Sequence, residues 1–577
     1  VSGFLVNRSY FVPVRGGSAS VDGVVGCPQG SPLSPLVWNI VANSVFELPL
    51  GEGVLVFIYA DDVNIIVKGS SRRRVEGSAQ CVLDRLLEWS ALNGVSFNTV
   101  KTRGLVVAKG NKYVGRPPVL AMGGARVRFT RQIKVLGVVI DDKLSFLPHL
   151  VEVKDKVVRL TLALSRLARN NNLKSFTVFM ELYRRCIERV ILYGVGAWYK
   201  DSEHSEMMDR LTSIQRVPLL KACKGYNTVP NRALPALCHV LPIDLKALEE
   251  VLFFRVWQAR QDVVVGERRI ECAGIDYPYP VWRVHPVDWV VVKFSRPTNV
   301  VYSGYTLFTD GSKAAGGVGA GFCLFKGHEI IHTGQVGLPC EASVFEAELA
   351  AMHFGLGYLA ESGIVGEVSV YTDSLSLLQA LHNPVHGNAK IVHLKHVIKG
   401  IRLGGVRIRF NFIHSHTGVT GNDFADKLAN LARDGPVTWD PGGSKTWVRN
   451  VIREHVWRVW EERWSGYDHW IRRWLYSVRC GERVAPDYFL TQLFSGHGGF
   501  PAYLKSRNIR DDGSCGCGAL VADAAHYVLD CGGTRVLRAG LGAALGVPLS
   551  ADNLSFLLSR TGVLDTLRDI VRYANTQ

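Results

Sequence analysis

The sequence predicts a multidomain chain that combines α/β parts with all-α parts, and three observations carry this prediction. The 577 residues suffice for about three to five domains of ordinary size. Mixed strand and helix patterns occupy residues 1 to about 110 and residues 305–433, whereas the rest reads mostly as helical. Two stretches rich in Pro, Trp or Gly, at 276–300 and 436–446, interrupt these patterns and read as linkers.

The composition is that of a folded, basic protein. Hydrophobic residues make up 47% and charged residues 20%, which is typical of globular rather than disordered chains. Lys and Arg number 67 against 51 Asp and Glu, and the net charge of +16 favours an anionic polymer as partner. A basic but otherwise ordinary soluble protein is the alternative.

The expected location of the protein is inferred from three features: apolar runs, the N-terminal residues and the cysteines. It contains no run of 18 apolar residues, so we expect no transmembrane helix and no membrane partner. The start at Val1, without Met or a signal-peptide pattern, indicates a fragment or a processed product. The 12 cysteines are thinly spread, which favours a reducing, intracellular compartment.

A first acidic pair lies in the segment VLVFIYADDVNIIV, which predicts a β-hairpin with Asp61 and Asp62 at its bend. Two adjacent acids there repel unless a cation compensates them, and nucleotidyl transfer uses two metals held by carboxylates. Upstream, the loop GCPQGSPLSP feeds a helix. Gly30 permits close backbone approach to a nucleotide or template, and Gln29 supplies an amide. A solvated Asp-Asp turn and a plain serine-capped helix start are the alternatives.

PQGSPLSP followed about thirty residues later by YADD resembles the palm of reverse transcriptases, in particular those of non-LTR retrotransposons. WSALNGVSFNTVKT resembles the next palm motif, IKVLGVVIDDKLSFLPH the primer grip and ILYGVGAW the thumb. The resemblance implies that Asp61 and Asp62 are catalytic and bind Mg²⁺ or Mn²⁺. It also implies that Gln29, Gly30 and Lys101 contact nucleotide or template.

One departure from the family concerns a third palm acid. The family uses an aspartate on an earlier strand, and Asp22 lies too close to the PQG loop to serve. We therefore expect the fingers and that aspartate to be missing, the polymerase site to be incomplete and the chain alone to catalyse no templated DNA synthesis.

A second set of acids is spread over residues 305–433. Its members are Asp310 at a strand end before a Gly-rich turn, Glu348 on an amphipathic helix, Asp373 at another strand end, and Asp426 on a last helix. Four converging carboxylates repel strongly unless cations neutralise them, and two Mg²⁺ ions are the expected use. Glu346 and Asp423 are second choices, and we expect Glu346 to be solvated.

The strings TDGS, AEL, TDS and GNDFAD, in this order, resemble the ribonuclease H superfamily. The resemblance implies that Asp310, Glu348, Asp373 and Asp426 hold Mg²⁺ or Mn²⁺. It also implies that His416 assists product release or proton transfer. Taken singly, each string is also an ordinary turn, helix cap or polar loop. His414 stands where family members often have an aromatic residue.

The C-terminal region carries a Cys/His cluster with the spacing C-x-C-x8-H-x4-C. Its members are Cys515, Cys517, His526 and Cys531. Three thiols and one imidazole can form a tetrahedral zinc site, and unmetallated core cysteines are the alternative. The surrounding segments resemble the zinc-knuckle-like tail of the same retroelements. We expect His497 to be a helix-end residue, not a ligand.

A Trp- and Arg-rich helix precedes this cluster. Trp457, Trp460 and Trp464 share one helical face, which favours packing in a core and leaves the arginines free to meet phosphates. Stacking of the tryptophans on bases is the alternative.

Together the resemblances imply six segments. These are a partial reverse transcriptase palm at 1–145, a helical thumb or connection at 146–275, a linker at 276–300, a ribonuclease H domain at 301–435, a linker at 436–446, and a basic helical tail with the Cys/His cluster at 447–577. The internal ribonuclease H resembles that of the I-like and ingi-like groups of non-LTR elements, whereas the thumb and tail look like those of arthropod elements that insert into ribosomal DNA. Both alternatives stay open.

The leading hypothesis is an RNA-directed DNA polymerase fragment with ribonuclease H, from a non-LTR retrotransposon. Its expected partners are template RNA, primer or target DNA, the RNA:DNA hybrid and deoxynucleoside triphosphates, in nucleus and cytoplasm as a ribonucleoprotein. Two alternatives remain. One is a stand-alone hybrid ribonuclease whose palm remnant only binds nucleic acid, and the other is an RNA-binding relic.

Overall fold

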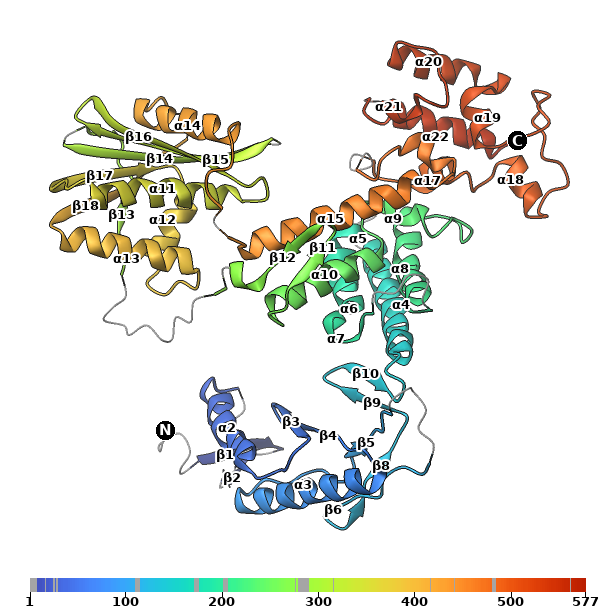
Figure 1. The fold of residues 1–577 in the computed structure, drawn as a ribbon. Coiled ribbons are helices and arrows are strands. Elements are labelled where there is room, and N and C mark those ends of the chain that lie inside the picture. Colours follow the sequence, from blue (N-terminus) through green and yellow to red (C-terminus); the bar gives the residue numbers. More distant parts are fainter. Residues whose placement is uncertain are drawn as a thin grey trace. The chain divides into compact units, whose positions relative to one another are not determined.

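The computed structural model divides into two compact units, residues 1–152 and 153–577. Figure 1 traces the chain through both, and each is described by itself. The described residues are 8–15, 17–23, 26, 28, 30–108, 115–170, 176–200, 206–275, 277–278, 290–302, 304–314, 316–415, 417–440, 442–479, 484–560 and 562–577.

The first unit is built around one antiparallel hairpin and a long helix. Its elements are β1 (Arg8–Val14), β2 (Gly17–Gly23), α2 (Leu33–Asn43), η1 (Ser44–Glu47), β3 (Val54–Tyr59), β4 (Asp62–Val67) and α3 (Arg72–Leu92). Strands β3 and β4 pair from Val54↔Val67 to Tyr59↔Asp62. Their inner face packs on α3, where Val82, Leu86 and Trp89 are buried. The hairpin expected at YADD is therefore present.

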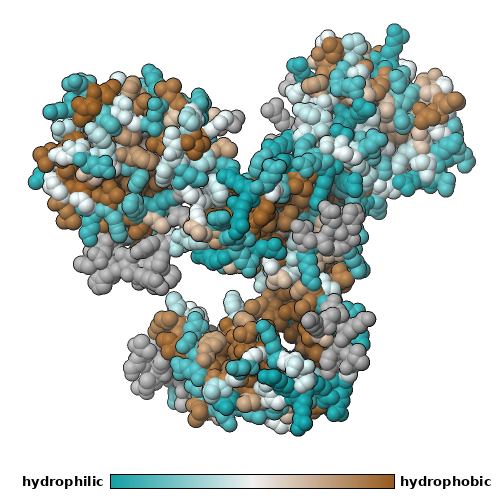
Figure 2. All heavy atoms as spheres, viewed as in Figure 1, coloured by the Kyte–Doolittle hydropathy of each residue, from teal (hydrophilic) through white to brown (hydrophobic). Residues whose placement is uncertain are grey.

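The outer face of this hairpin is apolar and exposed. Along β3 the side chains alternate between half-buried and exposed, as in a sheet covered on one face only. Leu55, Phe57 and Tyr59 are exposed, and hydrophobic residues are visible over this unit in Figure 2.

Short strands complete the first unit: β5 (Arg103–Gly104), β6 (Ala121–Met122), β7 (Ala125–Arg126), β8 (Arg128–Phe129), β9 (Gln132–Val135) and β10 (Val138–Asp141). Asp141 closes the loop after β10, because its carboxylate accepts hydrogen bonds from Ser145 N, Ser145 Oγ and Phe146 N. Burial opposes ionisation of Asp141, but these hydrogen bonds outweigh it and lower the pKa.

The second unit begins with helices, as expected for residues 150–260. The first, α4 (Leu147–Asn170), starts six residues before the boundary at 152/153. The others are α5 (Phe176–Leu182), η3 (Tyr183–Ile187), α6 (Glu188–Ile191), α7 (Val195–Trp198), α8 (Glu206–Cys223), α9 (Ala233–Cys238) and α10 (Ile243–Trp257). A small hairpin follows, β11 (Val263–Val265) with β12 (Arg268–Ile270). Helix α15 (Lys445–Ser465) packs on α10 and this hairpin through an apolar cluster.

The Trp-rich helix α15 differs from its expectation in two respects. Trp460 and Trp464 are buried, as expected, whereas Trp457 is half-buried. Three of its arginines pair with acids of α10: Arg449 with Glu250, Arg453 with Glu249 and Arg463 with Asp244. The expectation of a free arginine face is wrong for these three, because α10 presents a complementary acidic face.

The α/β part is a six-stranded sheet of order β13-β18-β17-β14-β15-β16. Its strands are β13 (Phe294–Ser295), β14 (Tyr305–Ala314), β15 (Gly317–Lys326), β16 (Glu329–Leu338), β17 (Gly366–Thr372) and β18 (Val406–Phe412). Strands β14, β15 and β16 pair antiparallel, whereas β14, β17, β18 and β13 run parallel. β13 lies within the range read from sequence as a linker.

Helices cover both faces of this sheet (Figure 1). They are α11 (Val344–Glu361), α12 (Leu375–His382), α13 (Ala389–Leu403) and α14 (Thr420–Arg433). Leu307 packs with α11, α12 and α13, whereas its neighbour Phe308 packs with α14. This alternation follows from the two-residue period of a strand.

The tail is helical after α15, with α16 (Ile471–Trp474), α17 (Tyr488–Ser495), α18 (Pro501–Ser506), α19 (Ala524–Leu529), α20 (Arg535–Leu545), α21 (Leu554–Leu557) and α22 (Val563–Ala574). It joins the helices of the same unit through polar contacts, including Thr491 Oγ1 donating to Cys223 O at 2.6 Å. Among the described helices, none is long and apolar enough to cross a membrane.

Candidate active and metal sites

Two aspartates of the α/β domain come together because two parallel strands stop pairing at the same level. The parallel register of β14 with β17 ends at Thr309↔Thr372, and Asp310 and Asp373 are the next residues. The expectation that Asp310 ends its strand is wrong, because β14 continues to Ala314 in its pairing with β15. The DGS string is therefore strand rather than turn.

Helix α11 supplies the third acid. Its N-terminus is fixed by a capping box in which Ser343 Oγ accepts from Glu346 N and the Glu346 carboxylate accepts from Ser343 N. The strand passes very close to the helix at Gly311, where a Cβ atom would lie 2.5 Å from Glu348 N. Only glycine permits this approach, and it brings Glu348 beside Asp310.

The capping box corrects the expectation for Glu346. This residue is 5% exposed rather than solvated, since its carboxylate completes the helix cap. The pattern Ser343-x-x-Glu346 could have shown this from sequence, because it is the signature of a capping box. The choice of Glu348 over Glu346 for the acidic cluster agrees with the geometry.

Asp310, Glu348 and Asp373 form one compact carboxylate cluster. One oxygen of each lies within 4.8 Å of the others. Burial, followed by the charges of Asp373 and Asp426, raises the pKa of Asp310 to about 8. Burial, followed by Asp310 and Asp373, raises the pKa of Glu348 well above its usual value. Oε2 of Glu348 is buried without a hydrogen-bond partner among the described residues.

These features fit divalent cations. Carboxylate oxygens are hard ligands that suit Mg²⁺ and Mn²⁺, and bound cations would relieve both the repulsion and the unpartnered oxygen. Without a metal, burial and mutual repulsion oppose ionisation of these acids, and a bound cation would favour their charged form.

The fourth expected acid, Asp426 on α14, lies beside the cluster but outside the group of three. It contacts Asp310, and its Oδ1 accepts from Asn430 Nδ2 at 3.0 Å. Asp423 lies in the first turn of α14 and is half-buried. His416 is outside the described residues.

The palm residues are arranged differently. Asp61 and Asp62 are exposed at the two-residue turn between β3 and β4, where Ala60 adopts a left-handed conformation with φ 52°. Trp38 Nε1 donates to Ala60 O at 2.7 Å and ties α2 to this turn. Among the described residues, no third acid, His or Cys joins these two aspartates in a group that could hold a metal.

The remaining palm residues are only partly described. Gly30 is exposed with φ +85°, which favours glycine, and Gln29 lies outside the described residues. Lys101 is exposed in a turn closed by Lys101 N donating to Asn98 Oδ1.

The Cys/His residues of the tail converge as the spacing predicted. Cys515 Sγ lies 3.7 Å from Cys531 Sγ, and Cys517 Sγ lies 3.4 Å from His526 Nε2. Zinc–sulfur bonds of about 2.3 Å put two sulfurs of a tetrahedral site about 3.8 Å apart, so these distances fit zinc. The N–H groups of Ala519 and Gly532 lower the pKa of Cys517 to about 6, which favours the thiolate that a metal needs.

His497 takes no part in this cluster. It follows the end of α17 by two residues, and its N–H donates to Ser495 Oγ. Burial, followed by His469 and Arg507, lowers the pKa of His497 to about 4.

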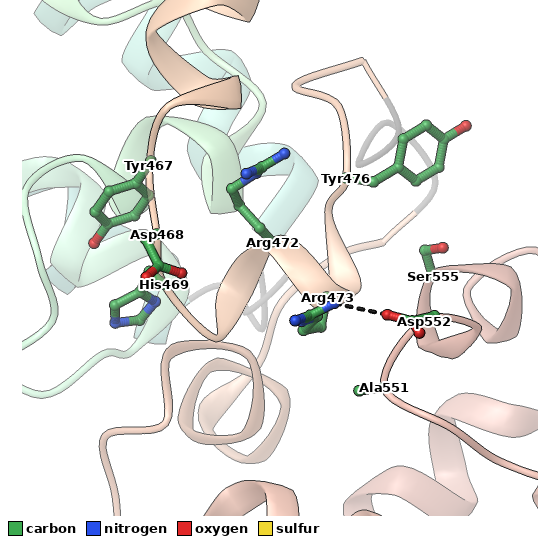
Figure 3. Close-up of a pocket in the computed structure, with 9 residues that line it drawn as sticks. All are labelled: Tyr467, Asp468, His469, Arg472, Arg473, Tyr476, Ala551, Asp552 and Ser555. Atoms are coloured by element: carbon green, nitrogen blue, oxygen red, sulfur yellow. Dashed lines mark hydrogen bonds and ion pairs between the residues drawn. The ribbon is translucent and has the colours of Figure 1, made fainter.

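A hollow of about 280 Å³ lies elsewhere in the tail, beside α16 and the start of α21 (Figure 3). Its walls include two arginines and two aspartates, and Arg473 pairs with Asp552 at 2.7 Å. Because these charges balance, the hollow lacks the excess positive charge of a phosphate site, and we assign it no role.

Comparison with known families gives two matches. Residues 4–140 match the family model "Reverse transcriptase (RNA-dependent DNA polymerase)", and residues 303–434 match the model "RNase H". The second match encloses the carboxylate cluster, and the first encloses the YADD hairpin.

Three of the similar curated proteins belong to retrotransposable or mobile elements. A Pol polyprotein of the type-1 element R1 from Bradysia coprophila is 27% identical over 240 residues, which are 42% of this chain and 24% of that protein. One from Nasonia vitripennis is 27% identical over 48% of this chain and 72% of its own length. The RNA-directed DNA polymerase of the element jockey from Drosophila melanogaster is 26% identical over 34% of this chain and 22% of its own length.

Among solved structures, the ribonuclease H1 of Halobacterium salinarum is 20% identical. It covers 22% of this chain and 97% of its own, with a TM-score of 0.20. The chain spans about a quarter of the length of the Bradysia relative.

Proposed function

From the match of residues 4–140 to the reverse transcriptase family and of residues 303–434 to the RNase H family, we propose a function for this chain. It is the ribonuclease H-bearing part of a non-LTR retrotransposon Pol polyprotein. It degrades the RNA strand of RNA:DNA hybrids and contributes a palm segment to DNA synthesis on element RNA. Its compartment would be the cell interior, as a ribonucleoprotein in cytoplasm and nucleus.

The observation that carries the ribonuclease proposal is the buried carboxylate cluster of Asp310, Glu348 and Asp373. Two bound Mg²⁺ or Mn²⁺ ions would activate a water and stabilise the leaving oxygen of the RNA. The chain's own residues would hold the cations at the level where β14 and β17 stop pairing, with Asp310 and Glu348 largely buried there. Asp426 completes the set, and His416 would assist proton transfer or product release.

The test is cleavage of an RNA:DNA hybrid by the 577-residue chain with Mg²⁺. Asp310→Asn removes one ligand and should lower the rate by orders of magnitude. Glu361→Gln, an exposed acid at the end of the same α11, should cleave like the wild type. Wild-type cleavage by Asp310→Asn would overturn the assignment.

For the palm segment, the exposed turn with Asp61 and Asp62 is the proposed metal-binding part of a polymerase site. By the family resemblance, Gln29, Gly30 and Lys101 would contact template or deoxynucleoside triphosphate beside it. Template RNA and a DNA primer or target are the corresponding partners.

For the tail, we propose one structural Zn²⁺ held by Cys515, Cys517, His526 and Cys531. The sulfur–sulfur and sulfur–nitrogen distances support it. Zinc measured per chain should be close to one for the wild type and for Cys186→Ser, whose thiol is exposed outside the cluster. It should fall towards zero for Cys517→Ser. Zinc-free, folded wild-type protein would show that these cysteines are merely packed.

The six segments read from the sequence are proposed as the domain organisation. The sheet and its covering helices fall within 290–435, and the Cys/His cluster within 447–577.

A further inference from the structure

The fourth carboxylate of the ribonuclease site is held by a side chain outside the acidic set. Asn430 lies four residues after Asp426, one turn further along α14. Its Nδ2 donates to Asp426 Oδ1 at 3.0 Å. A carboxylate fixed through one oxygen keeps the other for a cation.

The direction of the Asn430 amide is determined by its other partners. Oδ1 of Asn430 accepts from Ser312 Oγ at 2.7 Å and from Arg433 Nη1 at 2.7 Å. Turning the amide over would place its NH₂ group against the Arg433 donor and its oxygen against the Asp426 carboxylate. Because guanidinium only donates and an ionised carboxylate only accepts, the amide has one satisfactory orientation.

Both supporting residues are themselves fixed. Ser312 stands on β14 two residues after Asp310, on the strand that carries the central acid. Arg433 Nε and Nη2 donate to the two carboxylate oxygens of Asp434, at 2.9 and 3.0 Å, which leaves Nη1 directed at Asn430 and Ser312. The network therefore joins the strand of Asp310 to the helix of Asp426.

We propose that Asn430 is a positioning residue that orients Asp426 for metal binding, and that Ser312 and Arg433 hold it in place. The inference rests on the proposed ribonuclease H function. Without Asn430, Asp426 would keep its charge but lose its fixed direction.

The test measures Mn²⁺ binding to the full chain without nucleic acid, by calorimetry or electron paramagnetic resonance. Loss of a residue that orients a ligand typically weakens metal affinity by about 10–100-fold, so Asn430→Ala should raise the Mn²⁺ dissociation constant by about tenfold or more. Ser312→Ala should have a smaller effect, since Arg433 still holds the amide. Leu431→Ala, an exposed neighbour on α14, is the control and should bind as the wild type does.

Hybrid cleavage gives a second readout. Asn430→Ala should need a correspondingly higher Mg²⁺ concentration for half-maximal cleavage, whereas KM for the hybrid at saturating Mg²⁺ stays unchanged. Excess Mg²⁺ or Mn²⁺ should restore most of kcat. Alanine has a higher helix propensity than asparagine, so α14 should be retained, which circular dichroism would check.

The variant Asp310→Asn distinguishes failure of the Asn430 proposal from failure of the ribonuclease proposal. If it weakens Mn²⁺ binding while Asn430→Ala binds like the wild type, Asn430 has no positioning role and the ribonuclease assignment stands. If neither variant alters Mn²⁺ binding, the carboxylate cluster is not a metal site and both proposals fall.

Discussion

The YADD turn and the carboxylate cluster both consist of acidic side chains, but the acids of the turn are exposed whereas Asp310 and Glu348 of the cluster are buried. Asp61 and Asp62 are neighbours in one hairpin turn and are exposed. Asp310 and Asp373 come from strands far apart in sequence, and Asp310 is 7% exposed beneath α11. In the first setting water compensates the charges, whereas in the second the pKa of Asp310 rises to about 8. Packing, rather than the local motif, therefore decides which acids need a cation.

The largest effect is expected where β14 passes close to α11 at Gly311, beside Glu348. Gly311→Ala would place a Cβ 2.5 Å from Glu348 N, against helix backbone that cannot move alone. Overpacking of this kind costs about 1–3 kcal/mol. We expect faster hydrogen exchange in β14 and α11 and weaker Mn²⁺ binding.

The matched control for that prediction is Gly357→Ala on α11. Nothing lies within 4 Å of its added Cβ, so it should instead stabilise the helix by about 0.5–1 kcal/mol. Normal exchange and Mn²⁺ binding in Gly311→Ala would mean that the helix and strand can separate freely.

A second prediction compares two glutamates on one helix. Without metal at neutral pH, Glu348→Gln should raise the melting temperature of the α/β domain by several degrees. The glutamate is ionised in the unfolded chain and must lose that charge on burial, a cost that glutamine does not have. Glu346→Gln keeps the capping acceptor but loses a favourable charge at a helix N-terminus, so it should destabilise by about 0.3–1 kcal/mol. Thermal unfolding in metal-free buffer measures both. If both substitutions raised the melting temperature, or both lowered it, the distinction between a capping glutamate and a cluster glutamate would be wrong.

The third prediction concerns pH. Between the unfolded pKa of about 4 and the folded pKa of about 8, folded Asp310 binds more protons than unfolded Asp310. The metal-free α/β domain should therefore lose stability as pH rises from 5 to 8. Saturating Mg²⁺ should flatten this slope, and Asp310→Asn should reduce it. Hydrogen exchange of β14, corrected for intrinsic rates, would follow the effect, and a rise in stability with pH would contradict it.

The candidate acids of both proposed sites stand in short motifs of fixed order, which is why the sequence alone singles them out. The helical character of 150–260 and the α/β pattern were predictable from the periodicity of apolar residues, and the convergence of the Cys/His residues from their spacing. The resemblance to non-LTR retrotransposon polymerases is confirmed by the two family matches and by the R1 and jockey relatives.

Other features depended on packing that local patterns do not express. The DGS string looks like a turn, but pairing with β15 carries the strand through it to Ala314. The arginines of α15 look free until α10 is seen to supply acids at the matching positions. Asn430 matches no motif, and its role depends on Ser312, a residue distant in sequence. Long-range partners of polar side chains are what the sequence could not reveal.

The smallest effect is expected at the exposed YADD turn, where a hydrogen bond from Trp38, rather than burial, supports the position of the acids. Trp38→Phe keeps an aromatic ring of smaller size but removes the donor to Ala60 O, which should cost about 0.5–1.5 kcal/mol. Hydrogen exchange of residues 59–62 should rise, with that of β14 unchanged. Ala60→Gly, which relieves the left-handed strain at φ 52°, should act in the opposite direction. If Trp38→Phe leaves exchange at the turn unaltered, strand pairing alone holds Asp61 and Asp62, and the tie from α2 is incidental.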